Sequence, residues 1–346
     1  AANIGDTAIL DYPACFPDSL IGMTPKTGEL TLEYINLYFK FIKGYLENLA
    51  PQSAQKNINY QQLSPVPIVM PPLEIQQRAV QIYQEALTRR EQKEQQTQDL
   101  LARIDGYLLA ELGITLPQQN TRHNPSFIVR LSEVESRLDP HQFHHERVNT
   151  IKAIRTNNPV IRLHQLVKNA KELTSVINEK DIYIGLENIT SNTGEYIATS
   201  EKQSISSAIL FKKGNILFPK LRSYLNKVYL AEFDGLCSTE FHVFESLDFN
   251  PEFLAILLRS VLVVNQTKHL MTGNTLPRLQ TEDIKNLIIP LVPIQKQNQI
   301  VEHVSNIRTQ AQRLQTEAAQ ILADAKAEVE RMILGDSGGE PCPPAG

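Results

Sequence analysis

The 346-residue sequence contains no tryptophan and only three cysteines, Cys15, Cys237 and Cys342. Their wide spacing excludes a zinc knuckle and a disulfide framework and is compatible with a reducing compartment. No run of 18 apolar residues occurs, so we expect no membrane-spanning helix. The opening residues, AANIGDTAIL, lack the basic start and the long apolar stretch of a signal peptide. These absences together predict a cytoplasmic protein.

An excess of positive charge is also absent, because 34 basic and 38 acidic residues give a net charge of −4. Nucleic-acid-binding proteins usually carry a basic surface, so positive charge would have to be concentrated locally. The sequence has no glycine-rich cofactor loop, no Walker loop and no nuclease-like carboxylate–lysine constellation. Asn124-Pro125-Ser126-Phe127 is similar to the NPPF motif of adenine methyltransferases, but serine replaces the second proline. We therefore expect a binding protein that is not an enzyme, with no catalytic residue, metal or cofactor of its own.

The sequence contains one unit twice. Residues 57–80 align without a gap to residues 278–301 at an offset of 221. The matched pairs include Ile58 with Leu279, Leu63 with Ile284, Val66 with Leu287, Ile68 with Ile289, Pro72 with Pro293 and Gln76 with Gln297. Residue 1 then corresponds to about residue 222, so the first copy lacks a counterpart of residues 127–221. Either the chain is truncated or that part comes from elsewhere.

Each copy continues into a long polar helix. The first is predicted over 73–111, with Pro72 at its start and Gly113 just past its end. The second is predicted over 294–334. Its apolar residues alternate in steps of four and three, the heptad spacing of a helix that packs on a partner helix; they are Ile300, Val304, Ile307, Ala311, Leu314, Ala318, Ile321 and Ala325. We expect the two helices to pair antiparallel.

The remaining segments predict an α+β fold, with globular domains of mixed β-sheet separated by the helix pair. Residues 1–72 are predicted as strands, a helix over 31–49 capped by Thr31, and a short strand at Ile68–Met70. The expected organisation is an incomplete first domain at 1–72, the first helix at 73–113, a linker at 114–126, a complete domain at 127–293, the second helix at 294–334 and a disordered tail at 335–346.

One segment concentrates positive charge. From Lys202 to Ala231 the sequence has six basic residues and no acidic one. DNA phosphates need such cations, and Tyr224 and Asn226 add hydrogen-bonding groups. The candidate DNA-contacting residues here are Lys212, Lys213, Lys220, Arg222, Tyr224 and Lys227. The alternation around Leu221 and Leu225 predicts that Lys220, Arg222 and Lys227 share an exposed face. The alternative is a hairpin whose solvated face is basic without binding DNA.

Two polar loops at matching positions of the repeat are further candidates. Residues 273–278 contribute Asn274, Thr275 and Arg278, and residues 52–57 contribute Lys56 and Asn57. Arginine and asparagine can read base edges with paired hydrogen bonds, although an ordinary loop explains both segments equally well. A histidine cluster, HQFHH at 141–145, has metal-ligand spacing, but no carboxylate or cysteine completes a site nearby in the sequence. We interpret it as a polar loop.

The motifs resemble those of the specificity subunits of type I restriction–modification systems. In the second copy they are RLDP at 137–140, YIGLENI at 183–189, GNILFPKLRSYLNKV at 214–228, STEFHVF at 238–244 and GNTLPRLQTEDIKNLIIPLVPIQKQ at 273–297. In the first copy they are FPDSLIGM at 16–23 and SAQKNINYQQLSPVPIVMPPLEIQ at 53–76. This chain departs from the pattern in the incomplete first domain and in Ser223, where relatives often have proline.

The resemblance implies two target recognition domains that read a bipartite site on double-stranded DNA, with the helix pair as a spacer. It also implies that methyltransferase subunits, which use S-adenosylmethionine, and a restriction subunit assemble on the chain. Two alternatives remain open. The chain can be the recognition module of a fused restriction–methylation enzyme, or a coiled-coil adaptor without a DNA role. The recognised bases do not follow from the sequence.

Overall fold

The computed structural model describes residues 4–17, 19–49, 58–117, 139–170, 172–176, 181–198, 206–273, 275 and 277–334. The chain divides into two compact units, which are described separately below. The first unit comprises Ala1–Gln98 with Gln310–Gly346, and the second comprises Asp99–Thr309. Two long helices, α4 (Leu73–Glu111) and α10 (Ile294–Leu334), contribute to both units. Among the described residues, no helix is both long and apolar enough to cross a membrane.

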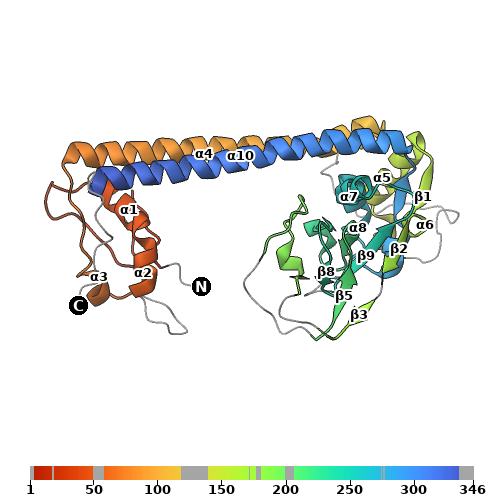
Figure 1. Cartoon of the computed structure of the whole chain (residues 1–346), viewed down its shortest axis with the longest axis horizontal. Helices are drawn as coiled ribbons and strands as arrows, with labels where there is room; N and C mark the ends of the chain where they lie inside the picture. The colour runs from red at the N-terminus through yellow and green to blue at the C-terminus, as the bar shows by residue number, and fades with distance from the viewer. Residues whose placement is uncertain are drawn as a thin grey trace. The chain divides into compact units, whose positions relative to one another are not determined.

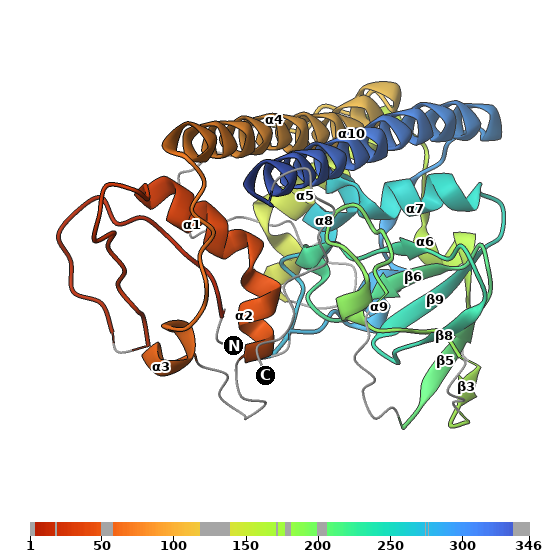
Figure 2. The same ribbon diagram turned by 60° about the vertical axis from the view of Figure 1, so that its left-hand side comes forward.

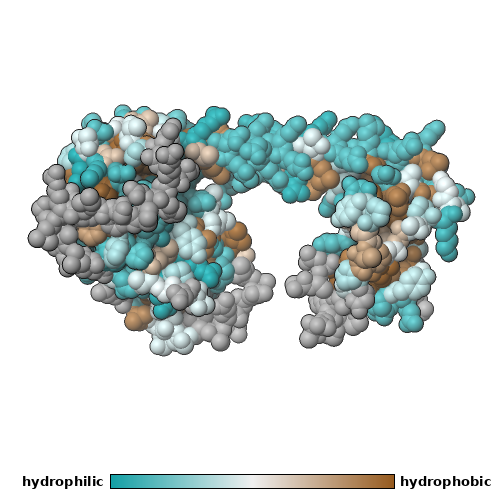
Figure 3. Space-filling view, turned by 180° about the vertical axis from the view of Figure 1, so that it is seen from behind, coloured by the Kyte–Doolittle hydropathy of each residue, from teal (hydrophilic) through white to brown (hydrophobic). Residues whose placement is uncertain are grey.

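The two long helices confirm the prediction from the heptad pattern. They lie side by side in Figures 1 and 2, and their outward surface is mostly hydrophilic in Figure 3. In the first unit, the Lys93 amine of α4 lies 2.7 Å from a carboxylate oxygen of Glu317 in α10. In the second unit, the rings of Tyr107 and His303 stack with centroids 3.8 Å apart. Residues late in α4 thus meet residues early in α10, so the pairing is antiparallel.

The start and end signals of α4 also act as expected. Pro72 precedes the helix, and its carbonyl accepts hydrogen bonds from the second turn. Gly113 follows the helix with φ +64°, a left-handed conformation that glycine adopts without steric cost. The heptad positions of α10 are buried or half-buried, with Ile300 and Val304 almost fully inaccessible. The apolar seam therefore packs along its length.

The first unit is helical in its described part. The Thr31 hydroxyl accepts a hydrogen bond from the Tyr34 N–H, which confirms Thr31 as the N-cap of α1 (Leu32–Phe41). The helix expected over 31–49 is interrupted at Ile42, so α2 (Lys43–Leu49) is separate; α3 (Tyr60–Leu63) follows. Tyr34 is fully buried, and burial raises its pKa to about 12. Its ring packs with Ala79 of α4 in the core of this unit.

The prediction of strands in residues 1–72, including one at Ile68–Met70, is wrong. No described residue of that range lies in a strand. The second copy supplies the physical reason. There the matching segment forms strand β10 (Ile288–Pro290), which pairs antiparallel with β1 (Val160–Arg162). Among the described residues no strand pairs with Ile68–Met70, and a strand without a pairing partner leaves its backbone groups unsatisfied.

The second unit has the expected α+β fold with a mixed sheet. Its strands are β1, β2 (Val167–Ala170), β3 (Leu173–Thr174), β4 (Tyr183–Ile184), β5 (Ala208–Phe211), β6 (Ile216–Pro219), β7 (Tyr229–Leu230), β8 (Gly235–Cys237), β9 (Phe241–Ser246) and β10. Its shorter helices are η2 (Pro140–Phe143), α5 (His145–Asn157), α6 (Leu163–Leu166), η3 (Leu186–Asn188), η4 (Ser223–Leu225), α7 (Pro251–Arg259), α8 (Val261–Thr267) and α9 (Thr281–Lys285).

Two four-stranded sheets form the middle of the second unit. The first has the order β2-β9-β6-β7 and is antiparallel throughout. The second has the order β3-β5-β8-β4, and only its β4–β8 pair is parallel. Side chains alternate along β6, so Ile216 and Phe218 face the core shared with α7 and α8 (Figure 2), and Leu217 faces the second sheet. The first sheet is consequently buried on both faces.

Two buried glutamines, Gln76 and Gln297, make matching contacts in the two copies, which supports the internal repeat. Gln297 donates from its amide to the Val292 carbonyl at 2.7 Å and accepts from the Asn250 N–H at 2.8 Å. Gln76 likewise donates to the Pro71 carbonyl and accepts from the Thr31 N–H. In both copies the glutamine therefore joins the start of a long helix to the residue that caps a short helix, α1 in the first copy and α7 in the second.

Candidate nucleic-acid interface

Two of the predicted segments, far apart in sequence, meet in the second unit. Thr272 and Arg278 exchange backbone hydrogen bonds of 2.9 and 2.8 Å, so the chain turns back between them. Residues 220–226 follow β6 and run beside this turn. The Arg222 N–H donates to the Pro277 carbonyl at 3.0 Å, and the Leu279 N–H donates to the Lys220 carbonyl at 2.9 Å. We call residues 220–226 and the described residues of 272–278 the paired turns.

The paired turns present four predicted side chains to solvent. These are Arg222, Tyr224, Thr275 and Arg278, and Tyr224 has 45% of its surface accessible. Arg222 forms no ion pair with any residue that the structure describes. The guanidinium of Arg222 can donate paired hydrogen bonds to a phosphate or to a guanine edge. The two hydroxyl groups beside it can form hydrogen bonds with phosphate oxygens.

The backbone at Arg222 is held in an uncommon conformation. Its φ and ψ are +46° and +51°, the left-handed region that crowds the Cβ of every residue except glycine. Asn226, on the other side of η4, also has a positive φ. Two hydrogen bonds hold the segment in place. The Arg222 N–H donates to the Pro277 carbonyl, and the Asn226 side-chain amide donates to the Arg259 carbonyl at 2.7 Å. Strain retained in this way is often found where a side chain must be presented in a fixed direction.

Arg278 is oriented by a residue that sequence reasoning missed. Its guanidinium lies 2.5 and 3.3 Å from the two carboxylate oxygens of Glu240. Glu240 falls in the motif STEFHVF at 238–244, which is the only sequence signal that pointed to it. The carboxylate fixes the arginine fork while offsetting part of its charge. Arg278 is therefore a directed hydrogen-bond donor more than a source of net positive potential.

The predicted shared face of Lys220, Arg222 and Lys227 is wrong. The Lys220 amine is half-buried and donates to the Thr239 carbonyl at 2.6 Å. Burial lowers the pKa of Lys220, although the Glu240 carboxylate opposes the shift. The Lys227 amine is half-buried and donates to the Leu186 carbonyl at 2.8 Å. The segment is a turn with a 3-10 helix instead of a strand, so alternate residues do not point the same way.

Other predicted residues lie elsewhere. Lys212 and Lys213 are exposed in the turn between β5 and β6, and the strand β6 separates them from the paired turns. Asn226, expected as a hydrogen-bonding group for DNA, is buried and bonded within the protein, so that expectation is wrong. Asn274, Lys56 and Asn57 lie outside the described residues, as does most of the predicted linker.

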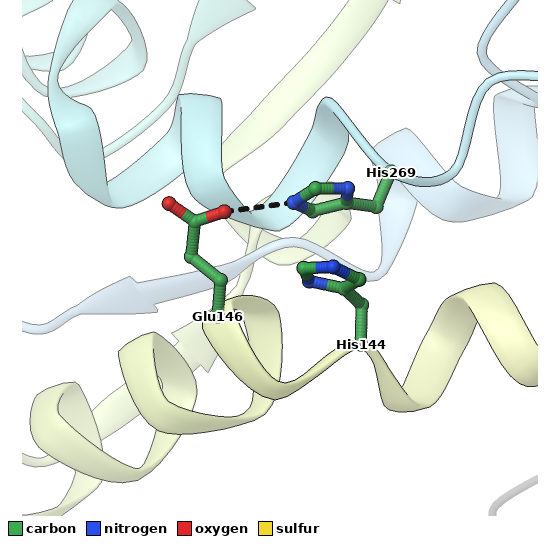
Figure 4. Close-up of side chains that lie close together, drawn as sticks. All are labelled: His144, Glu146 and His269. Atoms are coloured by element: carbon green, nitrogen blue, oxygen red, sulfur yellow. Dashed lines mark hydrogen bonds and ion pairs between the residues drawn. The ribbon is translucent and has the colours of Figure 1, made fainter. Parts of the chain in front are cut away.

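The interpretation of HQFHH as an isolated polar loop is also incomplete. His141 is exposed as expected, but His144 packs against His269, and the Glu146 carboxylate lies beside both (Figure 4). The carboxylate is only two residues from His144 in sequence. His269 comes from the chain just after α8, which local spacing did not reveal.

Comparison with known proteins places the chain in a family. The family model described as "Type I restriction modification DNA specificity domain" matches residues 1–102 and 162–323, well over half of the chain. The type I restriction enzyme EcoDI specificity subunit of Escherichia coli is 25% identical over 181 residues, which cover 51% of this chain and 40% of that protein. The chain thus matches about two-fifths of the length of this relative.

Two solved structures are also similar to this chain. The HsdS subunit from Thermoanaerobacter tengcongensis is 13% identical, with a TM-score of 0.40 over 88% of this chain and 70% of that chain. The S subunit of the type I restriction–modification system from M. genitalium is 13% identical, with a TM-score of 0.46 over 88% of this chain and 73% of that chain. On the family match, the chain belongs to the family of type I restriction–modification DNA specificity proteins.

Proposed function

We propose that this chain reads DNA for a type I restriction–modification complex and performs no catalysis itself. The paired turns are the observation that carries this proposal. They join two separate segments into one surface with a free guanidinium at Arg222, a guanidinium directed by Glu240 at Arg278, and exposed hydroxyl groups. Arginine forks recognise guanine edges and phosphates, and hydroxyl groups bond phosphate oxygens, so the chemistry of the surface suits duplex DNA.

We assign different roles to the basic residues of this region according to their contacts and exposure. Lys220 and Lys227 donate to backbone carbonyls and hold the shape of the segment. Arg222 is the residue that we assign to base or phosphate contact, because its side chain is exposed and its backbone is held rigidly. Lys212 and Lys213 are placed to contact phosphate at a second point, at the other end of β6.

The long helices fit a spacer role. A helix of 39 residues, the length of α4, extends about 60 Å at 1.5 Å per residue. In the proposal, the helix pair fixes the separation of two half-sites, one read by the second unit and one by the first. Methyltransferase subunits, which bind S-adenosylmethionine, and a restriction subunit dock on the chain. Family membership supports this assembly.

The test is the salt dependence of binding to duplex DNA, measured by fluorescence anisotropy. If Arg222 neutralises a phosphate, Arg222→Ala should reduce the slope of log K against log salt by about 1. The control Lys152→Ala removes an exposed cation from α5 of the same unit and should leave the slope unchanged. An intact chain with no affinity for duplex DNA would favour the adaptor alternative. A slope that changes only in Lys212→Ala with Lys213→Ala would move the interface to the other end of β6.

A further inference from the structure

His144, Glu146 and His269 form a compact cluster (Figure 4). One potential ligand atom from each residue lies within 4.8 Å of the others. His144 caps the start of α5, Glu146 belongs to the first turn of α5, and His269 follows α8. All three side chains are partly buried, and the Glu146 side chain has only 12% of its surface accessible. Three ligating groups thus converge from two elements at a sheltered position.

The contacts within the cluster leave one buried nitrogen without a partner among the described residues. The Glu146 carboxylate accepts from the Lys268 amine at 2.6 Å through one oxygen and pairs with His269 Nε2 at 2.7 Å through the other. The His144 ring stacks on the His269 ring, with centroids 3.4 Å apart. His144 Nδ1 is buried and has no hydrogen-bond partner among the described residues. A buried nitrogen without a partner has a free-energy cost, which a ligand at this point would offset.

The ligand types in the cluster suit coordination. A neutral imidazole has a lone pair available, and metal ions bind histidine in this form. The carboxylate of Glu146 supplies a negative charge to balance part of the charge of a cation.

We propose that His144, Glu146 and His269 bind a divalent transition-metal ion, with Zn²⁺ as the best match. Two imidazoles and one carboxylate are a ligand set that zinc accepts, with water in the fourth position. At zinc–ligand distances of about 2.0–2.2 Å, tetrahedral ligand atoms stand about 3.4 Å apart. The ligand atoms now lie within 4.8 Å of one another. Rotations of the three side chains can bring them to the tetrahedral separation without a change of fold. Coordination through His269 Nε2 requires a neutral ring with its proton on Nδ1, so the proton between His269 and Glu146 moves to Nδ1 or, from a cationic ring, leaves to solvent.

The position of the site indicates a structural role. The chain leaves α8 at Thr267, passes through His269 and enters the turn at Thr272. A metal bound here would fasten the base of that turn to the start of α5. This inference does not depend on DNA binding, because none of the three ligands belongs to the paired turns.

Calorimetric titration of the metal-free chain with zinc chloride tests the proposal. We expect one equivalent of Zn²⁺ to bind, and His144→Ala and His269→Ala each to lose this binding. His141→Ala is the matched control, since it removes an exposed histidine from the same HQFHH segment, and it should bind as the intact chain does. Zn²⁺ should also raise the melting temperature of the intact chain and of His141→Ala, but not of the other two variants.

A measurement without any variant covers the case in which the histidine variants fail to fold. Co²⁺ added to the intact chain should give the visible absorption of a tetrahedral site, and an equivalent of Zn²⁺ should abolish it. An intact chain that binds no Zn²⁺ and shows no such absorption would overturn the proposal. Stoichiometric binding that survives in folded His144→Ala and His269→Ala proteins would overturn it equally.

Discussion

Replacing Arg222 with asparagine should separate the effect of this position on folding from its effect on DNA binding. The backbone at Arg222 is left-handed, which costs a non-glycine residue roughly 1–2 kcal/mol. Asparagine is one of the few residues that adopt this conformation readily. The Arg222 N–H bond to Pro277 does not involve the side chain, and the side chain is exposed, so the substitution removes no folded contact that the structure describes.

The expected effects have opposite directions. The free energy of unfolding should stay constant or rise by up to about 1 kcal/mol, which corresponds to roughly 2–4 °C in melting temperature for a unit of this size. DNA affinity should fall, and the slope of log K against log salt should decrease by about 1 if Arg222 contacts phosphate. Differential scanning calorimetry and fluorescence anisotropy measure the two quantities on the same sample.

Arg222→Lys is the control for this experiment, because lysine keeps both the charge and the strained backbone. Its melting temperature and its salt slope should match those of the intact chain. A clear fall in the melting temperature of Arg222→Asn would mean that the arginine side chain stabilises the fold. Unchanged DNA affinity in a folded Arg222→Asn protein would remove this residue from the interface.

Three further predictions concern the fold. Gln297→Leu leaves the Val292 carbonyl and the Asn250 N–H without their partner. Each loss should lower the free energy of unfolding by about 1–3 kcal/mol, measured by urea denaturation. An unchanged midpoint would contradict the role assigned to the glutamine. Cys15 is exposed, whereas burial raises the pKa of the Cys237 thiol to about 12. Iodoacetamide should therefore alkylate Cys15 and leave Cys237 unmodified in the native chain. Mass spectrometry that detects modified Cys237 would contradict this prediction. A carbodiimide should couple the Lys296 amine, at the start of α10, to the Glu111 carboxylate, at the end of α4, whereas parallel helices would keep these two groups apart.

Much of the helical structure could be predicted because its signals are local. Pro72 and Gly113 mark the ends of α4, and the heptad spacing of α10 identifies the buried seam. The strand expected at Ile68–Met70 was wrong for the opposite reason. Its apolar pattern matches that of β10, but a strand forms only with a partner, and no described strand pairs with Ile68–Met70. The organisation into six segments stays a prediction.

The candidate site could be predicted less well, since its geometry depends on long-range contacts. The sequence singled out Arg222, Tyr224 and Arg278, but only the fold shows that Arg222 and Arg278 share one surface. Glu240 was missed because the acid-free count covered only residues 202–231. The exposure of Lys220 was misjudged because the carbonyl that binds its amine belongs to a distant strand connection.

Selection from a random library of DNA duplexes tests the central claim most directly. The intact chain should enrich a defined sequence at the half-site read by the second unit, and Arg222→Ala should relax the preference at one position by about 1–3 kcal/mol if the arginine reads a guanine. Enrichment of no sequence by the intact, folded chain, at salt concentrations where it still binds DNA, would contradict the account.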